Sequence, residues 1–80
     1  MHLDIITPDK KVYNGEATSV ILPGTEGQFQ VLNRHAPLVS TLGRGSVVVD
    51  TGAAKQTYVI DGGVVEVLNN TVLVLAEAVL

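Results

Sequence analysis

Turn-forming residues divide this 80-residue chain into short apolar runs, with a turn signal about every 8 to 12 residues. Valine is the dominant apolar residue, and its β-branched side chain suits a pleated strand better than a helix. Helices confined to such short intervals are unstable on their own. The sequence therefore predicts one all-β domain over residues 1–80, a flattened antiparallel β-sandwich or barrel of about 8 to 10 short strands.

Proline and glycine mark the expected strand ends. Thr7-Pro8-Asp9 follows the first apolar run, and Asn14-Gly15 is a pair that favours a tight hairpin turn. A strand over Ala17–Leu22 is expected to stop at Pro23-Gly24. Two glycine-rich segments are also expected to turn the chain, Gly43-Arg44-Gly45 and Asp61-Gly62-Gly63. The first separates predicted strands at 37–42 and 46–50, and the second separates predicted strands at 55–60 and 64–68.

The apolar pattern of the strands differs along the chain. Around Phe29 and Val31 it alternates with Gln28 and Gln30, which predicts a strand with one wet side. Three other strands are apolar at successive positions: 47–49, 64–68 and 72–75. A two-layer sandwich covers only the inner face of each sheet, so the outer face of one sheet is expected to dock on another protein.

The composition excludes several functions. Lysine and arginine are few and scattered in a chain of net charge −3, which argues against binding to nucleic acid or to anionic lipid. The chain has no cysteine, and therefore neither a disulfide nor a thiolate zinc site. No apolar run approaches the roughly 20 residues of a membrane span, and no leader peptide is recognisable, so an intracellular, soluble protein is expected.

No catalytic, metal or cofactor site is expected. His2 and Asp4 share one face of a strand, with His35 as a third candidate, but two histidines without a close-spaced pair do not make a zinc signature. The serines stand in no nucleophile-elbow motif. The glycine-rich stretch around Thr25 lacks the lysine and the helix of a phosphate-binding loop.

Four ordered blocks of sequence closely resemble the β-sandwich domain of the epsilon subunit of F-type ATP synthase. They are Pro23-Gly24-Thr25-Glu26-Gly27, His35-Ala36-Pro37-Leu38, Gly62-Gly63-Val64-Val65-Glu66-Val67 and Val72-Leu73-Val74-Leu75-Ala76-Glu77. The opening residues 3–8 and the step Tyr13-Asn14-Gly15-Glu16 resemble the same family. The resemblance covers essentially the whole chain.

This resemblance implies a flattened sandwich and a non-catalytic rotor role. The family's epsilon subunit docks on the gamma subunit and on the ring of c subunits, and so couples ion-driven rotation to ATP synthesis. It implies a peripheral location on the cytoplasmic side of the bacterial inner membrane, within the complex. When the family's contacts are transferred to the matching positions, the resemblance implies a loop that faces the c-ring: Gly24, Thr25, Glu26, Gly27 and Gln28. It also implies a turn that faces gamma and the ring: Arg34, His35, Ala36, Pro37 and Leu38.

Three departures from the family pattern bear on these contacts. Gln28 is neutral where many relatives are acidic, so any charge pairing at the ring shifts to Glu26 or is replaced by hydrogen bonding. Asn33-Arg34 replaces the usual Pro-Gly, which removes a flexible position and adds a cation able to meet an acidic loop of the ring. The 80 residues lack the C-terminal helical hairpin with which relatives inhibit ATP hydrolysis and, in some cases, bind ATP. Neither inhibition nor nucleotide binding is therefore expected of this chain.

Two other functions fit a small sandwich. A carbohydrate- or peptide-binding module is the main alternative, although Tyr13, Phe29 and Tyr58 are few and dispersed for an aromatic platform. An esterase-like enzyme that uses His35 has only the loop position of this residue in its favour. The sequence does not distinguish a proton-coupled from a sodium-coupled synthase, or a bacterial from an organellar one.

Overall fold

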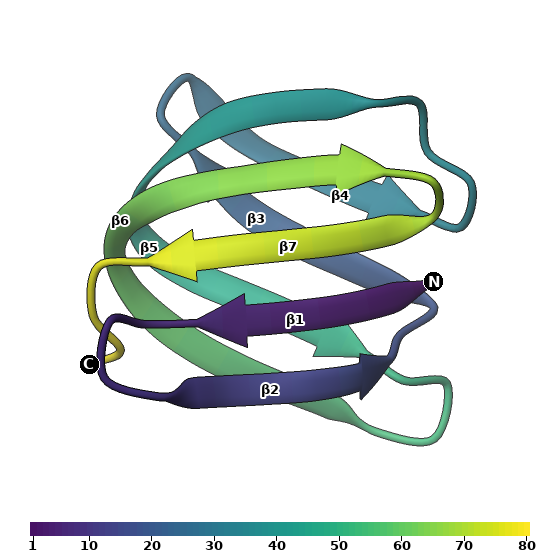
Figure 1. Ribbon diagram of the computed structural model, residues 1–80, viewed down its shortest axis with the longest axis horizontal. Coiled ribbons are helices and arrows are strands. Elements are labelled where there is room, and N and C mark those ends of the chain that lie inside the picture. The colour runs from purple at the N-terminus through teal and green to yellow at the C-terminus, as the bar shows by residue number, and fades with distance from the viewer.

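Two long, bent strands shape the computed structural model of the chain, which describes residues 1–80. Strands β5 (Leu38–Asp50) and β6 (Lys55–Leu68) pair antiparallel along almost their whole length. Both ribbons curve round one side of the molecule, so each contributes to a front layer and to a back layer (Figure 1). The two strands therefore join the layers of the sandwich covalently.

The shorter strands complete the two layers. The front layer adds β1 (His2–Ile6), β2 (Lys11–Glu16) and β7 (Thr71–Ala76), and the back layer adds β3 (Ser19–Gly24) and β4 (Gly27–Leu32) (Figure 1). Their order is β2-β1-β7-β6-β5-β3-β4, with β1 and β7 parallel and all other neighbours antiparallel. The predicted all-β class is confirmed. No helix meets the length and apolarity required to cross a membrane.

The predicted turns at Gly43-Arg44-Gly45 and Asp61-Gly62-Gly63 are wrong, because both segments bend a strand without ending it. The β5–β6 ladder continues across the bend, with Leu42 opposite Gly63 and Arg44 opposite Asp61. Gly62 and Gly63 have φ angles of 84° and 151°, which side-chain-bearing residues rarely adopt. The glycines thus allow a sharp bend within continuous pairing, and the chain has seven strands, fewer than predicted.

The turn predicted at Asn14-Gly15 is also wrong. Asn14-Gly15 lies within β2, paired with Asp4 and Leu3 of β1, because the chain already reverses at Thr7–Lys10. The strand predicted to stop at Pro23-Gly24 does end there, since Gly24 is the last residue of β3 and the reversal falls on Thr25-Glu26. Pro23 lies where the β3–β5 register is interrupted, so its missing N–H costs no bond to β5.

The core lies between the two layers and is almost entirely aliphatic. Its largest fully buried side chains come from six of the seven strands: Leu3, Ile5, Val20, Leu22, Val31, Val47, Val49, Ile60, Val65, Val72 and Val74. The alternation predicted for β4 is confirmed, since Val31 is buried, Phe29 is half-buried and Gln28 and Gln30 are exposed. Burying aliphatic side chains from both sheets is what holds the layers together.

Close packing of β5 on β3 makes Gly45 sensitive to substitution. A Cβ atom on Gly45 would lie 2.8 Å from Cβ of Pro23, whereas one on Gly43 would meet nothing nearer than the Pro23 carbonyl oxygen at 3.9 Å. We expect Gly45→Ala to lower the free energy of unfolding by about 1–3 kcal/mol. Gly43→Ala is its matched control and should change stability by less than about 0.5 kcal/mol.

Urea denaturation of the two variants, followed by far-UV circular dichroism, measures the difference. Equal unfolding midpoints for both variants would contradict the packing of Gly45 on Pro23.

Candidate docking surfaces

The outer face of the front layer carries a continuous set of apolar side chains. We call it the outer apolar face: Ile6, Val39, Val64, Leu68, Leu73 and Leu75. Register places Ile6 beside Leu75, and Leu75 beside Val64, so three neighbouring strands share one apolar row. Val39 is 68% exposed and Leu75 is 48% exposed. Apolar side chains grouped in this way on a surface typically mark a protein contact.

Two shallow grooves border the outer apolar face. The first groove is lined on one side by residues 6–8, where β1 ends and the next loop begins, and on the other side by residues 75–77, where β7 ends. The other lies between residues 37–39 at the start of β5 and residues 66–68 at the end of β6. The apolar row and the grooves form one surface on the front layer. Two acidic residues lie on this surface: Glu66, opposite Val39, and Glu77, which lines the first groove.

The outer face of the back layer is more polar. Ile21 and Val48 are half-buried there, while Val59 is 39% and Leu32 is 53% exposed. Exposed polar side chains surround them, namely Gln28, Gln30, Ser46, Lys55 and Thr57. The front layer is therefore the better candidate for the docking face that the successive apolar positions predicted.

The loop expected to face the c-ring forms the tip of the β3–β4 hairpin. Thr25, Glu26, Gly27 and Gln28 are exposed, and Gly24 is half-buried. Thr25 ties the tip to β5, because its N–H donates to the carbonyl oxygen of Thr41 at 3.1 Å and the two hydroxyl oxygens lie 2.8 Å apart. The tip is thus a polar surface held at both strands of the hairpin and at β5.

The turn expected to face gamma and the ring connects β4 to β5. Arg34, His35, Ala36 and Pro37 are exposed, and Leu38 is half-buried as the first residue of β5. The N–H of His35 donates to the carbonyl oxygen of Leu32 at 3.1 Å, which closes the turn. Pro37 and Leu38 also line a groove beside the outer apolar face, so turn and face form one surface.

The structure separates the two sets of expected site residues. The hairpin tip and the β4–β5 turn lie at opposite ends of β4, as Figure 1 shows. A strand of six residues spans about 20 Å. The tip and the turn therefore present separate contact points, and each adjoins the outer apolar face at Val39. The tip shares a groove with Val39, Ser40 and Thr41, whereas Pro37 and Leu38 of the turn line the groove on the other side.

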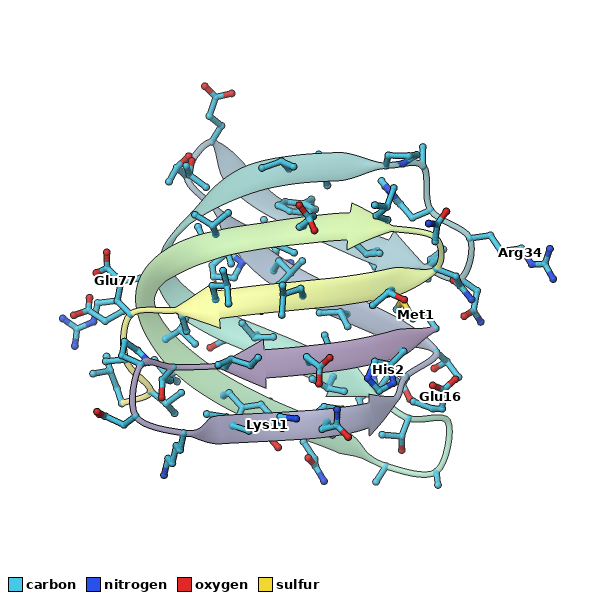
Figure 2. The ribbon with its side chains drawn as sticks, in the orientation of Figure 1. Met1, His2, Lys11, Glu16, Arg34 and Glu77 are labelled. Atoms are coloured by element: carbon cyan, nitrogen blue, oxygen red, sulfur yellow. The ribbon has the colours of Figure 1, made fainter.

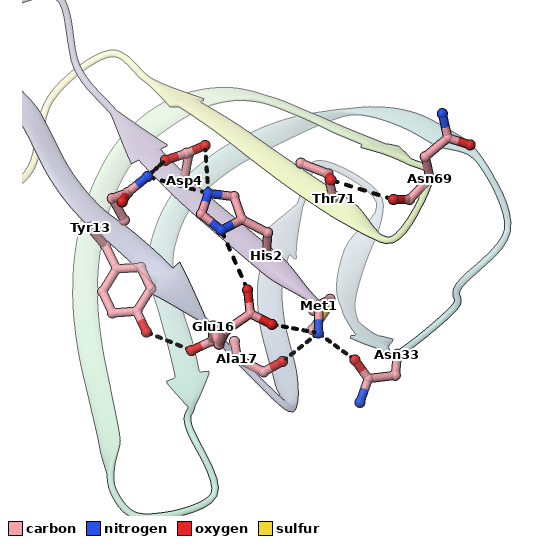
Figure 3. A network of polar contacts seen from close by, with 10 residues as sticks. Met1, His2, Asp4, Tyr13, Glu16, Ala17, Asn33, Asn69 and Thr71 are labelled. Carbon is pink, nitrogen blue, oxygen red and sulfur yellow. Dashed lines mark hydrogen bonds and ion pairs between the residues drawn. The ribbon is translucent and has the colours of Figure 1, made fainter.

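A polar cluster occupies the β1–β2 edge of the front layer (Figure 3). His2 Nε2 lies 3.2 Å from a carboxylate oxygen of Asp4, and its Nδ1 lies 3.5 Å from one of Glu16. The side-chain amide of Asn14 donates to Asp4 as well. The expectation that His2 and Asp4 share a face is confirmed, and the cluster gives this part of the sheet a hydrated surface.

The histidines do not come together. His35 lies in the β4–β5 turn, where its Nδ1 is 2.7 Å from the carbonyl oxygen of Ala36. No group of three or more potential metal-ligating side chains has a geometry suited to holding an ion. The three aromatic side chains, Tyr13, Phe29 and Tyr58, pack against the aliphatic core. They form no exposed aromatic platform of the kind that sugar-binding sandwiches use.

Residues 1–80 match the family described as "ATP synthase, Delta/Epsilon chain, beta-sandwich domain" over their full length. The chain belongs to this family. The match confirms the resemblance found in the four sequence blocks, and it agrees with the two-layer architecture of the structure.

Individual relatives agree with this assignment. The chain is 40% identical to an ATP synthase epsilon chain of Leptospira borgpetersenii over 77 residues, which cover 96% of this chain and 61% of the relative. It is 42% identical to an ATP synthase epsilon chain of Chlorobium limicola over 78 residues, 96% of this chain and 89% of that one. The present chain thus spans less than two thirds of the length of the Leptospira relative.

A solved structure shows the same fold. A chain in a structure of the Euglena gracilis mitochondrial ATP synthase, described as containing OSCP, F1 and c-ring, aligns with a TM-score of 0.90 and 26% identity. The alignment covers 98% of this chain and 51% of that one.

Some residues of these surfaces were not found from the sequence. Two members of the apolar row, the half-buried Ile6 and the exposed Leu75, were not singled out because the alternation of faces within β1 and β7 was not assigned. Asn70 was not singled out either, yet its side chain accepts a hydrogen bond from the N–H of Arg34 at 2.8 Å. Such contacts between distant turns leave no signal in the local sequence pattern.

The cluster around Asp4 makes a prediction about pH. The hydrogen bond from Asn14 is the main cause that holds the pKa of Asp4 below its ordinary value of 3.8, and the charges of His2 and Lys11 act in the same direction. This stabilisation is present above the unfolded-state pKa and is lost as the pH falls through the lower folded-state pKa. We expect Asn14→Ala to raise the pKa of Asp4, as measured by NMR titration of its carboxyl carbon.

Asn33→Ala serves as the comparison, since it removes an amide side chain that does not contact Asp4. A pKa of Asp4 that is the same in both variants would show that Asn14 is not the cause.

Proposed function

We propose that this chain is a non-catalytic central-stalk subunit of an F-type ATP synthase, which docks on gamma and on the c-ring and couples ion-driven rotation to ATP synthesis. The observation that carries the proposal is the outer apolar face, because soluble monomers rarely expose apolar side chains grouped in this way. Membership of the delta/epsilon family and likeness to a chain from an F1 and c-ring assembly support it.

The geometry favours a division of contacts between the two partners. The outer apolar face, continued by residues 34–38, is assigned to the gamma subunit, because apolar cores are typical of long-lived subunit interfaces. The polar hairpin tip at residues 24–28 is assigned to the polar loops of the c-ring. The chain would then lie at the membrane only through the complex, on the cytoplasmic side in a bacterium, without binding nucleotide or nucleic acid itself.

Two valines test the assignment to gamma. Val64 lies on the outer apolar face and Val59 lies on the back layer, and each is 39% exposed. We expect Val64→Asp to weaken binding of the chain to its cognate gamma subunit by at least about tenfold, because it places a charge in an apolar contact. Val59→Asp introduces the same charge at the same exposure and should leave the affinity unchanged.

Titration calorimetry with purified gamma measures both affinities, and circular dichroism checks that both variants fold. Absence of binding by the unmodified, folded chain would overturn the proposed function. Equal weakening by both variants would instead place the contact elsewhere on the sandwich.

Glu26 tests the assignment to the c-ring, since it is the one charged residue of the hairpin tip. We expect Glu26→Lys to reduce co-sedimentation of the chain–gamma complex with detergent-solubilised c-rings, because it reverses the charge at the contact. Asp9→Lys makes the same change in the exposed β1–β2 loop and should have no effect. If both variants sedimented like the unmodified chain, the tip would not be the ring contact.

A further inference from the structure

The β4–β5 turn contains an arginine in an unusual backbone conformation. Arg34 has a φ angle of 64°, in the left-handed region that residues other than glycine, asparagine and aspartate rarely adopt. It stands at the third position of a turn closed by the hydrogen bond from His35 to Leu32, where such a turn favours glycine. Something other than local preference must hold Arg34 in this conformation.

Contacts from two other parts of the chain hold the turn. Oδ1 of Asn70 accepts the hydrogen bond from the N–H of Arg34 at 2.8 Å. Oδ1 of Asn33 accepts one from the amino group of Met1 at 2.5 Å (Figure 3). The carbonyl oxygen of Asn70 also accepts the N–H of His2 at 3.1 Å, so Asn70 joins the turn to β1.

Asn70 is itself fixed by a tight hairpin. Asn69 and Asn70 connect β6 to β7, and their φ angles of 51° and 56° are those of the two central residues of a type I′ turn. The strands of this hairpin carry Val64, Leu73 and Leu75 of the outer apolar face. Asn70 therefore links the β4–β5 turn to the sheet that carries the proposed docking surface.

The guanidinium of Arg34 is directed outward by this arrangement. Figure 2 shows the side chain extending away from the body of the molecule at the end opposite Glu77. The ion pairs of the chain involve Met1 and His2 with nearby carboxylates, and none includes Arg34. The fixed backbone sets the direction in which the Arg34 side chain leaves the turn, and the planar guanidinium at its end matches a carboxylate.

We propose that Asn70 is a positioning residue that holds the turn at residues 33–37, and that the group it positions, Arg34, binds a carboxylate of the gamma subunit. The proposal rests on the docking function proposed above. Holding the turn before binding reduces the conformational entropy lost when the interface forms. Arg34 then determines the register of the partner on the outer apolar face, because a charged pair at the rim of an interface favours one alignment over others.

Two variants of one hairpin separate positioning from general stability. Asn70→Gly and Asn69→Gly both place glycine at a left-handed position that it tolerates, but only the first removes the acceptor for Arg34. In the isolated chain, we expect Asn70→Gly to speed hydrogen exchange of the Arg34 amide by about tenfold, the effect of losing one hydrogen bond. Asn69→Gly should not change it. Asn70→Asp, which retains an acceptor oxygen, should preserve the protection.

Titration calorimetry with the cognate gamma subunit supplies the second measurement. Arg34→Gln keeps a polar side chain at the left-handed position but removes the charge and the guanidinium fork, and we expect it to weaken binding about tenfold and to reduce the salt dependence. Asn70→Gly should weaken binding about threefold, through the freedom that it gives the turn. Asn69→Gly should bind like the unmodified chain.

The outcomes distinguish this proposal from the function on which it rests. If the unmodified chain binds gamma and Arg34→Gln binds equally well, or if Asn70→Gly and Asn69→Gly behave alike in both measurements, the role of Asn70 and Arg34 is overturned while the docking function stands. If the unmodified chain does not bind gamma, the proposed function fails, and the proposed role of Arg34 fails with it.

Discussion

Antiparallel pairing of β5 with β6 is the interaction on which the rest of the structure depends. The two strands contribute to both layers, and their common bend sets the relation between the layers. The bend needs backbone angles that Gly62 and Gly63 provide. Once it is formed, β7 and β1 extend the front layer and β3 and β4 extend the back layer. The aliphatic core then fills the space between two sheets that are already covalently joined.

The same bend explains why the sequence predicted the class of the fold but not its connectivity. Valine-rich runs and turn residues were sufficient for an all-β sandwich, and the alternation at Phe29 and Val31 assigned the faces of β4 correctly. Glycine, however, permits a turn, a bend or a bulge, and its local signal is the same in each case. Only the pairing partner decides between them, as at Gly62-Gly63. Asn14-Gly15 failed for a related reason, since Asp4 and Leu3 lie opposite and hold it in a strand.

The docking surfaces could likewise be predicted only in part. Successive apolar positions in three strands predicted that one sheet would carry an apolar outer face, and the sequence blocks identified the hairpin tip and the β4–β5 turn. The separation of these two surfaces by the length of β4 did not follow from their proximity in sequence. The contact between Arg34 and Asn70 joins residues 36 positions apart. It arises because two turns meet at one end of the sandwich, which local patterns do not encode.

The parallel pairing of β1 with β7 has a consequence for folding. His2 lies opposite Thr71 and Ile6 lies opposite Leu75, so β1 pairs on its inner side with β7, which is distant in sequence. During synthesis from the N-terminus, one edge of β1 in the β1–β2 hairpin stays unpaired until β7 has been synthesised. Contacts of such long sequence separation slow folding because loop closure precedes any gain from pairing. Pairing with β7 therefore removes the inner open edge of the β1–β2 hairpin, and only β2 and β4 remain as edge strands.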